Sequence, residues 1–271
     1  MLGSHVLLVL SAMLSLSHGQ LPPPAEPAGA LDIYARLADC SIGAHRGGSW
    51  HINNNSLARF ESALRDGADV IEMDLHLTKD GVPIIAHDPE LGIFFFRRAV
   101  KDMTLDEIRT RRLPILPPIP TLEEVLQWAD GRVVINAEFK EEAVIAPAVA
   151  LVQKYQAHEW VYFQTKSRET NYEIARALDP RVALLFKPVT DAQLAWALGL
   201  GDDRLVVIEI DRTMLRQDVI EQAHAAGKKV SYNSWRLDPF QELFQGNCSE
   251  VFDLGIDIAI SKRPERCDCD D

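Results

Sequence analysis

The 271-residue sequence is poor in positive charge. Its 28 Lys and Arg residues against 40 Asp and Glu residues leave a net charge of −12 at pH 7, so a nucleic-acid backbone would be repelled. The dense basic cluster at residues 109–112 is interpreted as the solvated end of a helix. The charge balance therefore argues against a nucleic-acid partner.

The sequence also lacks an N-terminal apolar run long enough to span a bilayer. The run Val6–Leu16 falls short of the roughly 20 residues that a membrane-spanning helix needs. Its length is typical of a secretory signal, and Ser17-His18-Gly19 supplies small residues for cleavage before Gln20. We expect a signal peptide at residues 1–19, a buried N-terminal helix being the alternative, and export to a periplasm, a secretory compartment or the cell exterior. A proline-rich leader, residues 20–38, is expected to pack poorly.

Cysteine is scarce as well. The four cysteines are Cys40, Cys248, Cys267 and Cys269, which an oxidising compartment could pair in three ways. The acidic tail, residues 267–271, contains two thiols without a nearby histidine, an incomplete ligand set for zinc. We expect at least one disulfide, which would attach this tail to the domain.

Short β-branched runs alternate with helical patterns from residue 39 to residue 266. The predicted strands are Ser41–Ala44, Val70–Leu75, Val133–Glu138, Trp160–Gln164, Val182–Phe186, Leu205–Ile210, Lys229–Tyr232 and Asp257–Ile260. The predicted helices are Ser56–Asp66, Leu122–Ala129, Glu142–Tyr155, Ser167–Leu178, Asp191–Leu198, Met214–Ala226 and Pro239–Leu254. The alternation indicates an α/β fold and favours a (β/α)₈ TIM barrel over a doubly wound sheet.

One segment, at about residues 75–120, interrupts the alternation. Lys79-Asp80-Gly81 is a turn signal between two short extended pieces, which predicts a β-hairpin after the second strand. Residues 89–120 are expected to form an irregular insertion. Its three adjacent aromatics, Phe94, Phe95 and Phe96, are interpreted either as core or as an apolar lip that contacts lipid or a partner.

Polar side chains end the first three predicted strands, where the chemistry of a (β/α)₈ barrel gathers. They are His45 and Arg46, Glu72 and Asp74, and Glu138 and Lys140. Glu72 and Asp74 are two residues apart, so both side chains face the barrel axis. Inward carboxylates repel each other unless a cation neutralises them, and oxygen ligands favour Mg²⁺ or Ca²⁺. Taken singly, the Glu-x-Asp pair could instead bind an internal Arg or Lys, and His87 could be an ordinary turn residue.

The motifs, in this order, resemble the glycerophosphodiester phosphodiesterase family. HRGG at His45, GADVIEMDLHLTKDG at Gly67, AHD at Ala86 and NAEFK at residues 136–140 match family elements over about 100 residues. The remaining chain is similar in its strand–helix alternation and in a late aromatic strand, YNSW at Tyr232.

The resemblance implies a TIM barrel that uses one divalent cation, Mg²⁺ or Ca²⁺, to hydrolyse small glycerophosphodiesters to sn-glycerol 3-phosphate and an alcohol. Carried over by position, the metal ligands would be Glu72, Asp74 and Glu138, the proton-exchanging residues His45 and His87, and the substrate contacts Arg46, Lys140 and Trp235. Which histidine is the acid, and whether water or the substrate's own 2-hydroxyl attacks, stay open.

The sequence departs from the family pattern at two places. Asn54 stands where the family usually carries a glutamate, so one negative charge near the proposed metal is missing. Lys262 stands where the family often has an acid after the last strand. We expect three residues to contact the metal ligands rather than the metal itself: Asn54, Asn55 and His76. Two alternatives therefore accompany the phosphodiesterase hypothesis: a lysophospholipase D or phospholipase D acting on lipids, and a non-catalytic phosphate-binding or partner-binding module.

Overall fold

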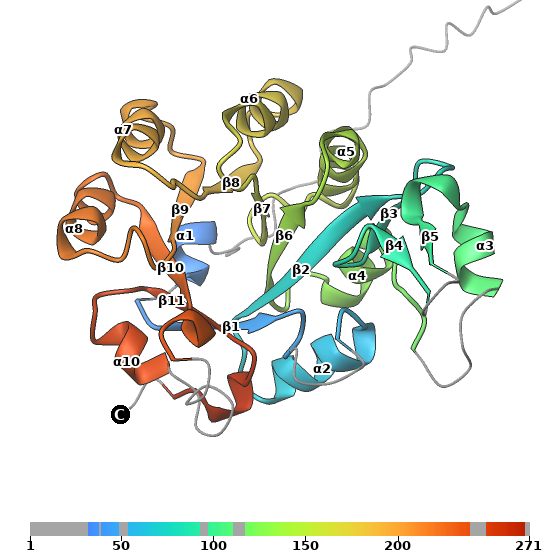
Figure 1. The fold of residues 1–271 in the computed structure, drawn as a ribbon, viewed down its shortest axis with the longest axis horizontal. Coiled ribbons are helices and arrows are strands. Elements are labelled where there is room, and N and C mark those ends of the chain that lie inside the picture. Colours follow the sequence, from blue (N-terminus) through green and yellow to red (C-terminus); the bar gives the residue numbers. More distant parts are fainter. Residues whose placement is uncertain are drawn as a thin grey trace, which may run out of the picture. The chain divides into compact units, whose positions relative to one another are not determined.

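Eight parallel strands close into a barrel, as the strand–helix alternation predicts (Figure 1). The computed structural model describes residues 32–37, 39–48, 54–92, 97–110, 117–238 and 248–268. Around the barrel the strands are β1 (Ser41–His45), β2 (Val70–Leu77), β6 (Val134–Phe139), β7 (Val161–Gln164), β8 (Ala183–Phe186), β9 (Leu205–Ile210), β10 (Lys229–Asn233) and β11 (Ile258–Ser261). Strand β11 pairs back onto β1 in parallel, which completes the ring.

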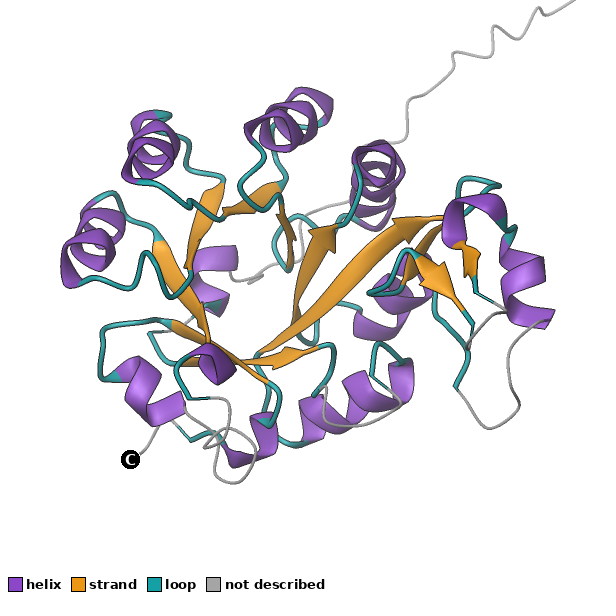
Figure 2. Ribbon diagram, in the orientation of Figure 1, coloured by secondary structure: helices purple, strands orange, loops and turns teal. Residues whose placement is uncertain are grey.

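Helices surround the strands on the outside (Figure 2). They are α2 (Leu57–Arg65), α4 (Leu122–Ala129), α5 (Ile145–Tyr155), α6 (Glu169–Leu178), α7 (Asp191–Gly199), α8 (Gln217–Ala225) and α10 (Cys248–Phe252). Each falls within or close to a predicted helix, although residues 239–247 of the last prediction lie outside the described part. Among the described residues, no helix combines the length and apolarity that crossing a membrane requires.

Helix α4 illustrates why the sequence forms these elements. Thr121 accepts a hydrogen bond from the backbone of Glu124, whose side chain in turn accepts one from the Thr121 backbone. This capping box satisfies backbone donors that the first turn leaves free. Apolar residues at helical spacing, Leu122, Val125 and Leu126, are buried against the strands.

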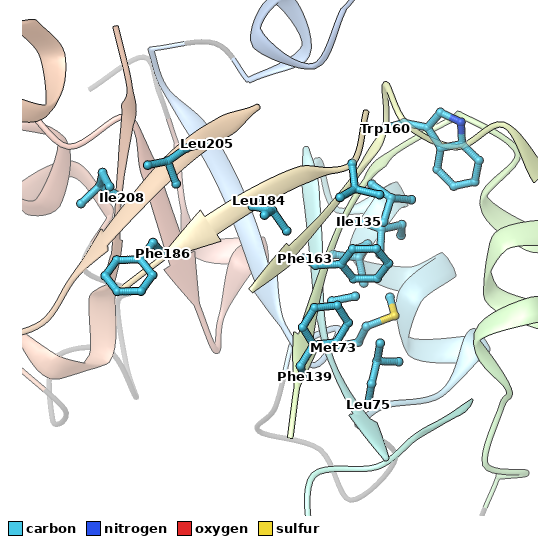
Figure 3. Packing of buried hydrophobic residues seen from close by; sticks show 14 of the residues in the cluster. Met73, Leu75, Ile135, Phe139, Trp160, Phe163, Leu184, Phe186, Leu205 and Ile208 are labelled. Carbon is cyan, nitrogen blue, oxygen red and sulfur yellow. The ribbon is translucent and has the colours of Figure 1, made fainter. Parts of the chain in front are cut away.

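Side chains on each strand alternate between the barrel interior and the layer between strands and helices. On β6, Ile135 and Phe139 point outward into the larger core, where Phe139 stacks on Phe163 with ring centroids 4.6 Å apart (Figure 3). Val134 points inward and packs with Val70 and other interior residues. The barrel interior near the amino-terminal ends of the strands is therefore apolar, and the inward positions near their carboxyl-terminal ends are occupied by polar groups.

The helix α1 (Ile33–Arg36) packs at the amino-terminal ends of the strands. Ile33 and Leu37 are fully buried in the barrel interior, and the Tyr34 hydroxyl donates to the carbonyl of Leu205 at 3.1 Å. The expected poorly packed leader, residues 20–38, therefore ends earlier, because residues 32–37 belong to the barrel unit. The predicted signal peptide lies outside the described residues.

The segment that interrupts the alternation after β2 forms the predicted hairpin. The part expected to be irregular contains further short strands and a helix. β2 extends past the barrel rim and pairs antiparallel with β3 (Pro83–Ile85). The following residues form β4 (Glu90–Leu91), β5 (Arg98–Ala99), a 3₁₀ turn at Val100–Asp102 and α3 (Leu105–Thr110). A small separate core joins these pieces: Ile84, Ala86, Val100, Met103 and Ile108. The Phe94–Phe96 prediction lies outside the described residues.

The expected disulfide is present between Cys248 of α10 and Cys267, which follows a 3₁₀ turn at Pro264–Arg266. It ties the C-terminal segment to the domain, as predicted. Cys40 also lies in a disulfide. Cys269 lies outside the described residues.

Candidate active site

Three carboxylates meet at the open end of the barrel. Glu72, Asp74 and Glu138 place ligand oxygens within 4.8 Å of one another, and all three side chains are buried. Strand pairing produces this, because Asp74 on β2 lies beside Glu138 on β6 and all three share the inward parity of their strands. Burial, followed by repulsion from Asp74 and Glu138, raises the pKa of Glu72 well above its ordinary value.

Cationic side chains surround the three acids. The Lys140 ammonium lies 2.7 Å from Asp74 Oδ1 and 2.5 Å from Glu138 Oε1, and Arg46 Nε lies 3.1 Å from Asp74 Oδ2. Although burial acts in the opposite direction, Lys140 and Arg46 hold the pKa of Asp74 below its ordinary value. Lys166 also contacts Glu138 Oε1, at 2.6 Å. The predicted phosphate contacts therefore lie directly beside the predicted metal ligands.

The chemistry of this group fits a hard divalent cation. Two further oxygens close to the acids, Asn55 Oδ1 and Asn136 Oδ1, are buried without a hydrogen-bond partner. Asn55 donates to Asp74 Oδ2 at 3.0 Å, and Asn136 lies beside Glu72 in the strand pairing. Clustered carboxylate and amide oxygens are the ligands that Mg²⁺ and Ca²⁺ prefer, and such a cation would offset the repulsion among the three carboxylates.

The turn after β1 presents His45 and Arg46 to the same site. Arg46 adopts a left-handed backbone with φ of 54°, and Gly47 and Gly48 follow with φ of 77° and 91°. The Arg46 backbone N–H donates to Glu72 Oε2 at 2.9 Å, while His45 Nε2 lies 3.8 Å from the same oxygen. Burial, then the charge of Arg46, lowers the pKa of His45 well below its ordinary value.

Two further predicted residues reach the site from other loops. His87 lines the cavity from the segment after β3, and its Nδ1 lies 2.8 Å from Asp88 Oδ1. His76 does not contact the acids; its ring bonds Glu141 and the carbonyl of His87, so it holds the loop that carries His87. Trp235 packs against His45 with ring centroids 4.2 Å apart.

The residues in which the sequence departs from the family pattern also lie here. Asn54 lines the cavity, but the neighbouring Asn55 makes the hydrogen bond to Asp74. Lys262 Nζ, just after β11, lies 4.8 Å from the centre of the Trp235 ring, a cation–π contact. Every residue predicted for the site is thus near it, although His76 acts through a loop.

The far side of the barrel mouth contains further polar residues that the sequence motifs did not predict. Glu209 on β9 accepts hydrogen bonds from Lys187 at 2.6 Å, from Asn233 at 2.9 Å and from Gln164 at 2.8 Å. Together with the acids they line a cavity of about 550 Å³. A sequence signal exists: Gln164, Lys187 and Glu209 each follow an inward apolar residue of their strand by two positions.

Comparison with known proteins gives consistent matches. Residues 45–238 match the model of the glycerophosphoryl diester phosphodiesterase family. Glycerophosphodiester phosphodiesterase 1 of Mus musculus is 38% identical over 261 residues, which cover 81% of this chain and 78% of that protein.

Solved structures share the fold. A glycerophosphoryl diester phosphodiesterase from Parabacteroides distasonis superposes with a TM-score of 0.73 at 21% identity, covering 88% of this chain and 90% of that one. An Oleispira antarctica phosphodiesterase, solved in complex with the product sn-glycerol-3-phosphate, has a TM-score of 0.65 at 21% identity, covering 83% and 94%. The family-model match and the mouse relative show that this chain is an enzyme belonging to the glycerophosphoryl diester phosphodiesterase family.

Proposed function

We propose that this enzyme hydrolyses small glycerophosphodiesters to sn-glycerol 3-phosphate and an alcohol, with one divalent cation held by Glu72, Asp74 and Glu138. The observation that carries the proposal is the convergence of these three buried carboxylates within 4.8 Å, beside two cationic side chains and two histidines. The fold it shares with the Oleispira antarctica phosphodiesterase that binds sn-glycerol-3-phosphate supports the same substrate class.

The chain's own residues supply the remaining chemistry. Arg46 and Lys140 would contact the non-bridging phosphate oxygens, and a bound divalent cation would supply further charge stabilisation there. His45 lines the cavity from the end of β1 and His87 from the segment after β3, so one can take the proton of the nucleophile while the other protonates the leaving alkoxide. Trp235 packs against His45 and limits the positions of its ring.

The family match supports hydrolysis over a non-catalytic binding module, the second alternative. The lipid-active alternative depended on Phe94–Phe96, which lie outside the described residues, and the cavity of about 550 Å³ is lined mainly by polar and charged side chains. A small polar diester suits such a cavity better than an acyl chain does.

Export stays part of the proposal. The apolar run Val6–Leu16 supports a cleaved signal, and the described cysteines Cys40, Cys248 and Cys267 all lie in disulfides, a bonding state typical of oxidising compartments. N-terminal sequencing of the mature protein tests this: a start at Gln20 supports export, and a retained Met1 contradicts it.

The decisive experiment combines turnover with cation binding. Purified enzyme would receive glycerophosphocholine, lysophosphatidylcholine or bis(4-nitrophenyl) phosphate, with Mg²⁺ or Ca²⁺ and with a chelator. The Glu72→Gln variant keeps the shape of the side chain but removes a ligand charge, so we expect at least a 100-fold loss of turnover and weaker cation binding by calorimetry. The exposed substitution Glu221→Gln on α8 is the matched control. Wild-type turnover by Glu72→Gln, or in chelator, would refute the metal assignment.

A further inference from the structure

The mouth of the barrel contains a second cluster of hydrogen-bonded polar side chains that the proposed mechanism does not use. It consists of Gln164, Lys187, Glu209 and Asn233, hereafter the distal wall. Strand β9, which carries Glu209, lies four positions from β2 around the ring of eight strands, so the distal wall faces the metal-binding acids across the mouth. All four residues line the same cavity as His45 and Glu72.

Hydrogen bonds within the wall occupy both oxygens of its carboxylate. Glu209 is 3% exposed; its Oε1 accepts from Lys187 Nζ and Asn233 Nδ2, and its Oε2 accepts from Gln164 Nε2. Because the ammonium neutralises its charge, Glu209 is not an anionic seat for a cationic ligand. Its physical effect is to fix the orientation of three neighbouring side chains.

Those fixed side chains offer a specific pattern to the cavity. With both amide nitrogens directed to Glu209, the amide oxygens of Gln164 and Asn233 remain as acceptors, and Lys187 keeps two further N–H donors. A donor beside two acceptors matches hydroxyl groups, which both donate and accept. A quaternary ammonium, which has no N–H or O–H, gains nothing from such a wall.

We propose that the distal wall is a hydroxyl-recognition subsite that binds a polyol portion of the substrate, with Glu209 as its positioning residue. The inference rests on the proposed phosphodiesterase function and adds the part of the substrate that the enzyme recognises. The polyol is either the glycerol moiety itself or a polyol alcohol on the other side of the phosphate. The two sources share one chemistry and differ in which substrates lose turnover when the wall is disrupted.

Turnover of three substrates tests the subsite: bis(4-nitrophenyl) phosphate has no polyol, glycerophosphocholine has glycerol only, and glycerophosphoglycerol has a polyol on both sides. For Glu209→Gln we expect kcat/KM to fall about 10- to 100-fold on the glycerol-containing substrates and to change little on the nitrophenyl diester, because misplaced positioning groups cost rates of that order. Loss on glycerophosphoglycerol alone identifies the alcohol side as the occupant. Equal loss on all three, or no loss, overturns the proposal.

Two further measurements keep the test independent of folding and of the proposed function. Lys187→Met changes a side chain that is 15% exposed and should reproduce the selective loss in a variant whose folding is checked by thermal denaturation. Glu221→Gln should leave all three rates unchanged.

Calorimetry with Mg²⁺ present compares sn-glycerol 3-phosphate with inorganic phosphate. The wild type should bind the glycerol ester at least about 10-fold tighter, and Glu209→Gln should lose that difference. If the wild type cleaves no diester, the proposed function fails. The binding difference then decides whether the distal wall binds the glycerol moiety, and the same comparison with uncleaved glycerophosphoglycerol decides whether it binds a polyol alcohol.

Discussion

Removing the Cys248–Cys267 disulfide should measurably destabilise the enzyme. The bond joins residues 19 positions apart and closes a loop that contains β11. A cross-link over a loop of that length removes about 11 cal/mol/K of chain entropy from the unfolded state, or about 3 kcal/mol at 25 °C. For a domain of this size, about 2 to 4 °C of melting temperature accompanies each kcal/mol, so we expect a loss of about 6 to 12 °C.

The assay is urea unfolding of the double variant Cys248→Ala/Cys267→Ala, followed by fluorescence and circular dichroism. Ser249→Ala, on the exposed side of α10, is the matched control and should unfold like the wild type. Activity should fall as well, because Pro264 in the bridged segment lies beside Gly48 of the turn that carries Arg46. A double variant whose unfolding free energy stays within 1 kcal/mol of wild type would refute the entropic reasoning.

Two other perturbations follow from the structure. Asp179 accepts hydrogen bonds from Arg181, His158 and Gln153, and Arg181 is the first cause of its lowered pKa. The stability that Asp179 contributes should therefore be complete above the pKa of this carboxyl in the unfolded chain, about 4, and should be lost as the pH falls below that value. Asp179→Asn should cost about 3 kcal/mol of unfolding free energy at pH 7 and less in acid, which urea unfolding at several pH values would measure. A pH-independent cost would contradict this assignment. Gly47→Ala should cost more stability and activity than Gly67→Ala, since both glycines have positive φ but only the first would meet neighbouring atoms; equal melting temperatures would show that sterics do not matter there.

The barrel could be predicted because its strands are short, buried and β-branched. Strand β9, Leu205–Ile210, matches its prediction in full, since every residue is buried and flanking turn residues limit its length. The four-residue helix α1 could not be predicted, because it follows a proline-rich leader and is stabilised by burial of Ile33 and Leu37 rather than by its own length.

The half of the site that contains the proposed metal ligands was predictable because its residues form local motifs. Glu72 and Asp74 share one strand, and their spacing alone places both inward. The distal wall was not predicted, because Lys187 and Glu209 lie 22 residues apart and meet only when neighbouring strands pair. Asn54 was expected behind the ligands beside Asn55, but Asn55 takes a left-handed backbone with φ of 54° and is the residue that reaches Asp74.

The separate small core beneath the His87 loop has a consequence for how the enzyme loses activity on heating. Ile84, Val100 and Met103 pack with one another apart from the main barrel core, so this segment can open locally at a lower free energy than global unfolding requires. Opening would carry away His87 while the barrel stays folded. The enzyme should therefore lose activity at a lower temperature than that at which the barrel melts. In hydrogen exchange, the segment that forms this small core should be the first region to exchange.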